Sequence, residues 1–225
     1  MQTQIGQLQI PVNPLLCARV DAVAPPDCIQ RAVVKRPIRR QSAHDYRRDS
    51  AVEIVQDLER DGMELFGLTR GQFSLSDLIE ALLEKIGPAR MEISTWTAAH
   101  ADVERMMLLM ESGKVRACRW LVDQTFVRRV PELAARIRET FGDDSIRVTR
   151  THAKFVTLRS EGWAVALRSS MNLNQNPRLE SFQVAHDPEL CDFLSAALDD
   201  VWRRQDKSLS LASTSDQLKW YRDHG

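Results

Sequence analysis

Hydrophobic and polar positions divide the chain into four segments with different periodicity. Residues 1–48 show little periodicity and contain five prolines, which predicts an irregular arm. Residues 49–86 follow the three-and-four spacing of amphipathic helices. Residues 87–205 alternate between short apolar runs and helical patterns, and the Ser-rich residues 206–225 form a tail. The pattern therefore predicts a basic arm, a helical segment, one main domain and a tail.

The helical segment 49–86 has two predicted helices joined by residues 67–72. The second is the better marked, because Ser74 or Ser76 can cap its start and Gly87-Pro88 ends it. A helix-turn-helix is one interpretation of this pair. Glu80 and Glu84 on the exposed face of the second helix would repel DNA phosphates, which argues against a recognition helix.

In residues 87–205, predicted strands alternate with predicted helices. The strands are 91–96, 115–122, 146–149 continuing through 153–158, 163–168 and 182–185, and the helices are 98–112, 131–141 and 189–204. Residues 160–162 form a hairpin turn between two of the strands. This order predicts an α/β fold with a mixed, mostly parallel sheet flanked by helices.

Composition and the distribution of apolar residues and cysteines argue against a membrane protein, a secreted protein and a metal-binding protein. Hydrophobic residues make up 43% of the 225 positions and charged residues 28%, as in ordinary globular domains. No apolar run approaches 18 residues, so no membrane span is expected. Residues 1–10 lack a secretory pattern, so we expect a cytoplasmic protein. The four cysteines form no close pair, so free thiols are expected and no metal site.

Net charge is zero, but arginine is unevenly distributed. Basic pairs crowd the end of the arm, and further arginines precede and follow the third predicted strand: Arg128, Arg129, Arg136, Arg138, Arg147 and Arg150. Such clusters can bind phosphates, although a solvated tail explains the arm equally simply.

A histidine and a lysine two positions apart give the candidate site. On a strand, His152 and Lys154 would point to the same face. Asn172 follows Lys154 by 18 residues, and Glu180 follows eight later. An imidazole beside an ammonium, with Ser and Asn donors nearby, suits a phosphate group. The alternatives are a strand-end histidine at 152 and turn-forming asparagines at 172, 174 and 176; Lys154 in an apolar strand still needs a partner or a wet cleft.

His152-x-Lys154, then Ser169-Ser170-Met171-Asn172, then Glu180 together resemble the motif of the phospholipase D superfamily. The resemblance covers residues 91–202 and extends, around 168–180, to prophage-encoded members. It implies a phospholipase D-like fold and a phosphodiesterase that needs no metal or other cofactor.

The resemblance also implies a role for each residue. His152 would attack phosphorus to form a phosphohistidine, or act as the partner acid. Lys154 and Asn172 would stabilise the non-bridging oxygens, and Glu180 would hold the far ring nitrogen of His152. Ser170, Arg150 and Asn174 would bind substrate.

The mechanism needs two histidines, and the sequence contains one copy of the motif. Members with one copy pair two identical chains, so the resemblance implies a homodimer with a shared cleft.

Two departures from the family pattern leave function open. Arg159 occupies the acidic position five residues after the lysine, and the spacing to Ser170 is longer than usual. The leading hypothesis is a nuclease-like phosphodiesterase acting on nucleic acid; a lipid substrate is less attractive because no basic amphipathic helix is predicted. The alternatives are a catalytically degenerate protein that binds nucleic acid or serves as a phage-related scaffold, and an adaptor built on residues 49–86.

Overall fold

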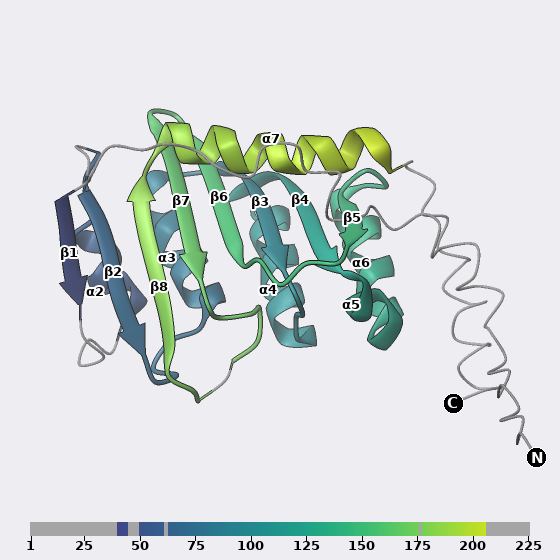
Figure 1. Ribbon diagram of the computed structural model, residues 1–225, viewed down its shortest axis with the longest axis horizontal. Helices are drawn as coiled ribbons and strands as arrows, with labels where there is room; N and C mark the ends of the chain where they lie inside the picture. The colour runs from purple at the N-terminus through teal and green to yellow at the C-terminus, as the bar shows by residue number, and fades with distance from the viewer. Residues whose placement is uncertain (1–39, 45–49, 61–62, 176, 206–225) are drawn as a thin grey trace, which may run out of the picture.

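The computed structural model describes residues 40–44, 50–60, 63–175 and 177–205, which form one eight-stranded sheet with helices on both faces (Figure 1). The strand order is β1-β2-β8-β7-β6-β3-β4-β5. The strands are β1 (Arg40–His44), β2 (Met63–Thr69), β3 (Ala89–Thr95), β4 (Val115–Asp123), β5 (Ile146–Thr149), β6 (Phe155–Ser160), β7 (Trp163–Ser169) and β8 (Glu180–His186). The helices are α2 (Ala51–Gln56), α3 (Leu75–Ile86), α4 (His100–Glu111), α5 (Gln124–Arg129), α6 (Pro131–Phe141) and α7 (Pro188–Arg204).

The sheet is mixed, and the expectation that it is mostly parallel is wrong. Three of the described pairings are parallel: β1 with β2, β3 with β4, and β4 with β5. The other four are antiparallel: β2 with β8, β3 with β6, β6 with β7, and β7 with β8. The antiparallel centre arises because β6, β7 and β8 follow one another without an intervening helix, so each reverses direction.

The predicted strand running from residue 146 through 158 is two strands with different neighbours. β5 pairs with β4 at the end of the sheet, whereas β6 pairs with β3 on the other side of β4. The connector 150–154 crosses between them and belongs to neither strand. His152 and Lys154 are therefore loop residues, and the argument that they share a strand face is wrong.

The segment 49–86, expected to be helical, contains strand β2 between α2 and α3. β2 has both faces largely covered, so its apolar residues lack the alternation that marks a half-exposed strand. Gly67 is required here, because a Cβ at this position would lie 2.2 Å from the ring of Phe182 on β8. Part of the expected irregular arm is also regular, since 40–44 form β1; the rest of 1–48 and the tail 206–225 lie outside the described residues.

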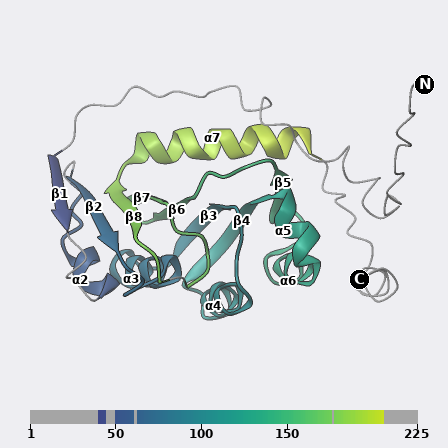
Figure 2. The same cartoon turned by 60° about the horizontal axis from the view of Figure 1, so that its bottom comes forward.

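Two hydrophobic cores fix the layers. Helices α2 to α6 cover one face of the sheet and α7 covers the other (Figure 2). The larger core lies beneath α2 to α6 and includes Leu65, Trp120 and Val156. The smaller core joins Leu121 and Phe155 to Leu194 and its neighbours on α7. Successive residues of the same strand contribute to different cores, because side chains alternate between the two faces of a pleated sheet.

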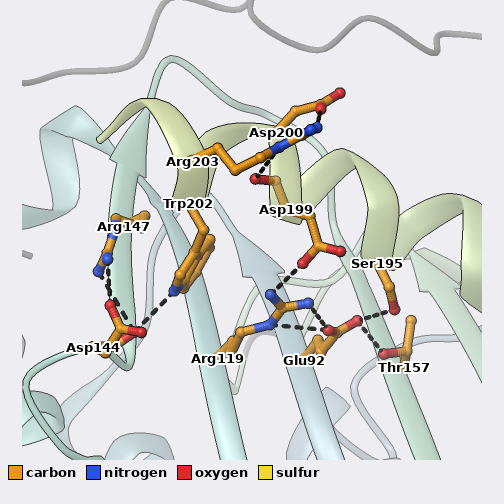
Figure 3. Close-up of polar contacts among 10 residues, drawn as sticks. All are labelled: Glu92, Arg119, Asp144, Arg147, Thr157, Ser195, Asp199, Asp200, Trp202 and Arg203. Atoms are coloured by element: carbon orange, nitrogen blue, oxygen red, sulfur yellow. Dashed lines mark hydrogen bonds and ion pairs between the residues drawn. The ribbon is translucent and has the colours of Figure 1, made fainter. Parts of the chain in front are cut away.

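A polar network also attaches α7 to the sheet, centred on Glu92 of β3 (Figure 3). The Glu92 carboxylate accepts hydrogen bonds from Thr157 (2.8 Å), Ser195 (2.6 Å) and the Arg119 guanidinium. Arg119 also bonds Asp199 on α7 at 2.6 Å. Glu92 is thus a mostly buried carboxylate whose partners come from β4, β6 and α7.

Among the described residues, no helix combines the length and apolar character needed to cross a membrane.

Candidate functional site

The chemistry-bearing residues gather at one edge of the sheet. β2, β3, β4 and β7 all end there, and β6 and β8 begin there. The connector 150–154 runs along this edge before entering β6 (Figure 1). Clustering at carboxyl ends of strands is a common placement for sites in α/β sheets.

Hydrogen bonds from neighbouring strands hold the connector. The backbone N–H of Thr151 donates to the Asp123 carboxylate at 3.0 Å, and the Thr151 hydroxyl accepts from the N–H of Ala153 at 3.1 Å. The Ser94 hydroxyl donates to the Ala153 carbonyl at 2.9 Å. The N–H of Ser169 donates to the Lys154 carbonyl at 3.2 Å. The connector therefore has a defined path although it lacks a strand ladder.

His152 and Lys154 lie together at this edge, as the motif requires. Lys154 Nζ lies 3.2 Å from Nδ1 and 3.4 Å from Nε2 of the His152 ring, and it donates to the His152 carbonyl at 3.0 Å. The in-plane hydrogen-bonding directions of the two ring nitrogens diverge, so an ammonium nearly equidistant from both is aligned with neither. The ring of exposed His152 therefore keeps a nitrogen available for a ligand.

Partial burial lowers the pKa of the Lys154 ammonium below its ordinary value, while attraction to the Glu180 carboxylate opposes that shift. Lys154 is thus a partly desolvated cation near the Glu180 carboxylate. An anion bound beside it would recover part of the lost solvation.

Ser170 and Glu180 form a second pair. The Ser170 hydroxyl donates to the Glu180 carboxylate and accepts from the N–H of Ser181 at 2.9 Å. Both hydroxyl functions of Ser170 are thereby engaged within the protein. The predicted hydrogen bond from the His152 ring to the Glu180 carboxylate is not found among the described residues, because Glu180 accepts from Ser170. The negative charge of Glu180 acts on the site by attracting the Lys154 ammonium.

Asn172 and Asn174 lie beside Glu180, lining a cavity of about 10 Å³ with Thr69 and Phe73. Asn172 Oδ1 is buried and has no hydrogen-bond partner within the described part of the chain. The cavity has at most the volume of one water, so these side chains do not surround a phosphate-sized space. Asn176 lies outside the described residues.

A larger open groove lies next to Lys154 and Ser170. Its volume is about 490 Å³, and most of the surface that lines it is apolar. The lining residues are Phe66, Ala153, Lys154, Phe155, Arg168, Ser169, Ser170, Ser181, Phe182, Gln183 and Leu194. Two of the predicted site residues thus border a space of the size that accepts a small ligand.

Two arginines singled out in the sequence have different surroundings. Arg150 is exposed at the start of the connector, two positions before His152. Arg159, at the position where the motif has an acidic residue, forms an ion pair with Asp192 on α7. The basic side chain at 159 is therefore neutralised on the α7 face of the sheet.

Two further side chains adjoin the site, those of Trp96 and Arg129. The Trp96 ring lies 5.8 Å from the His152 ring, centroid to centroid, and the Arg129 guanidinium lies 4.9 Å from the Trp96 ring centroid. Trp96 falls within the predicted strand 91–96, where a tryptophan is expected in the core or on a strand face. Its position directly after β3, at the carboxyl end of a parallel strand, is the signal that identifies it.

Within the described residues, no group of three or more His, Cys, Asp or Glu side chains is placed to hold a metal ion. Cys118 and Cys191 are buried free thiols.

Two solved structures show a remote likeness to this chain. No protein-family model matches the sequence, and no curated protein matches it. Polyphosphate kinase from Porphyromonas gingivalis is similar over 70% of this chain and 29% of its own, with 13% identity and a TM-score of 0.47. TrmBL2, an archaeal chromatin protein with a novel mode of DNA binding, is similar over 63% of this chain and 53% of its own, with 9% identity and a TM-score of 0.41. This chain therefore spans less than a third of the kinase and about half of TrmBL2.

Proposed function

We propose that the edge bearing His152 and Lys154 is a phospholipase D-like phosphodiesterase site that acts on nucleic acid. The observation that carries the proposal is the contact between Lys154 Nζ and the His152 ring, at 3.2 Å, on an exposed loop. A nucleophilic nitrogen beside an ammonium is what displacement at an anionic phosphorus requires, since the cation offsets repulsion between nucleophile and phosphate.

The proposed reaction has two balanced steps. In the first, a His152 ring nitrogen forms a bond to phosphorus as the bond to the leaving oxygen breaks, and a second histidine protonates that oxygen. In the second, the same histidine removes a proton from water, the water oxygen bonds to phosphorus, and the bond to His152 breaks. Lys154 neutralises the non-bridging oxygens in both steps. No step requires a metal ion.

A homodimer would supply the second histidine. The motif occurs once in the sequence, so a complete site would pair His152 of two chains across a two-fold axis. Sedimentation at micromolar concentration tests this part directly. A strict monomer that still turns over substrate would contradict the shared site and point to an acid from elsewhere in the chain.

Hydrolysis in EDTA tests the function itself. The substrates are bis(4-nitrophenyl) phosphate, a single-stranded oligonucleotide and its duplex. Cleavage of any of them, undiminished by the chelator, supports the proposal. Salt-sensitive oligonucleotide binding without turnover would instead support the second candidate, a degenerate phosphate-binding member, which the engaged Ser170 hydroxyl and the Arg159–Asp192 pair favour.

The proposal predicts a specific alkaline limit to activity. Lys154 must be charged to stabilise the transition state, and burial lowers its pKa from the ordinary 10.5. Activity should therefore be present at neutral pH and decline as pH rises, with a midpoint below 10.5. In Lys154→Arg the guanidinium stays protonated, so the decline should move to higher pH.

Lys85→Arg is the matched control, because burial also lowers the pKa of Lys85, which bonds the carbonyls of Val55 and Gln56 away from the site. It should leave the pH profile of kcat/KM unchanged. A decline that stays in place in Lys154→Arg would show that another group controls it.

A further inference from the structure

The surroundings of Trp96 bear on which phosphodiesters fit the site. This half-exposed indole follows β3 and lies on the same edge as His152, with ring centroids 5.8 Å apart and planes at 53°. An aromatic ring this close to a phosphate-binding histidine is within reach of whatever group is attached to the phosphate. In a nucleic acid that group is a nucleoside, and its base has a flat face suited to stacking.

Arg129 covers the Trp96 ring. Its guanidinium carbon lies 4.9 Å from the ring centroid, and the side chain is exposed at the end of the short helix α5. An exposed cation–π contact contributes less binding free energy than the stacking of a nucleobase on the same ring. A base can therefore displace the guanidinium from the ring. The displaced Arg129 side chain remains beside the bound nucleic acid, where it can pair with a neighbouring phosphate of the backbone.

Resting on the proposed function, we propose that Trp96 and Arg129 form a nucleobase subsite and that the substrate is single-stranded nucleic acid. Only an unpaired base exposes a face that an indole can cover, because duplex bases are stacked on each other. Trp96 thus selects nucleic acid with unpaired bases. Arg129 covers the Trp96 ring in the absence of substrate and binds the phosphate backbone when a base takes its place.

The chain contains a matched control for this subsite. Arg60 lies over Trp163 at 5.0 Å, in the same type of contact, with an exposed arginine and a half-buried indole. Trp163 begins β7 at the opposite edge of the sheet from His152. Variants of Arg60 and Trp163 therefore reproduce the chemical change without touching the site.

The experiment compares binding of two labelled 12-nucleotide probes, single-stranded oligothymidylate and an abasic strand of equal length and charge, by the full chain. The wild-type protein should bind the thymidylate strand about tenfold or more tightly, the effect of one stacked base. Trp96→Leu should remove this preference while leaving abasic binding unchanged, and Trp96→Phe should retain part of it. Trp163→Leu and Arg60→Gln should keep the full preference.

Arg129→Gln keeps the test informative if Trp96→Leu does not fold. It should weaken binding of the thymidylate strand and reduce the salt dependence of that binding by about one ionic contact, because the backbone contact is lost. Binding of the abasic strand, which has no base to displace Arg129 from the ring, should change little. Equal wild-type binding of the two strands, tighter binding of duplex than of single strand, or equal losses on both probes in Trp96→Leu would each overturn the subsite. Turnover without base preference would refute the subsite alone, whereas base preference without turnover of any probe would uphold it and refute the phosphodiesterase.

Discussion

His152→Ala is expected to lower kcat for phosphodiester cleavage by at least about 10³-fold, because it removes the atom that bonds to phosphorus. Binding should change much less, since Lys154 and the surrounding arginines remain. The exposed ring of His152 has its described contacts with Lys154 and Trp96 at the surface, so the variant should fold normally. Single-turnover kinetics with saturating enzyme isolate the chemical step from binding.

His100→Ala provides the control. His100 is also exposed and also has a side-chain partner, Glu132 at 3.3 Å, but it lies at the start of α4. It should keep the wild-type rate. Equal rates for His152→Ala and the wild type would show that a different nucleophile acts.

Glu92→Ala should lower the free energy of unfolding by about 3 kcal/mol, because it leaves the Arg119 guanidinium without its main partner beneath α7. The same change removes the acceptor for Thr157 and Ser195, so both hydroxyls also lose a hydrogen bond. Urea denaturation followed by far-ultraviolet circular dichroism measures the loss.

Glu84→Ala is the control, because it removes an exposed carboxylate and shows how much stability the loss of a surface carboxylate alone costs. Glu84 pairs with Lys114 on the surface, where ion pairs contribute about 1 kcal/mol or less. A Glu92→Ala variant no less stable than Glu84→Ala would contradict the assignment of Glu92 as the polar anchor of α7.

Much of the secondary structure was predictable because its signals are local. α3 has a Ser74–Asp77 capping box at its start and Gly87 at its end, and both are visible in the sequence. The β6–β7 hairpin is marked by the turn at Gly162, whose φ of 74° favours glycine. Strand order has no such local signal. The break between β5 and β6 depends on β3 and β4 pairing between them, and the paired residues are 26 to 69 positions apart in the chain.

Strand β2 was missed for a related reason. Its residues are largely buried on both faces, so its pattern lacks a period of two, and its neighbour β8 comes more than 100 positions later in the chain. Glu64 lies within this strand, and its partner Arg168 is about 100 positions later, at 3.2 Å. A charged residue in an apolar run weakens the prediction of a strand unless its partner is known.

Which residues form the candidate site was easier to predict from the sequence than how their side chains contact one another. The proximity of His152 and Lys154 followed from their spacing, although a loop and not a strand brings them together. The pairing of Glu180 with Ser170 did not follow from the motif, because both residues flank a loop whose path the sequence does not define. Trp96 follows another strand, β3, and the order of strands in the sheet brings it beside His152.

The most direct test of the account is to trap the covalent intermediate. The full chain is mixed with a 5′-labelled single-stranded oligonucleotide in EDTA, quenched in alkali within milliseconds, and digested for mass spectrometry. A phosphoryl adduct, stable in alkali and labile in acid, is expected on the peptide that contains His152, and no adduct is expected in His152→Ala. Turnover with no adduct, or an adduct on Ser170 or another residue, would contradict it.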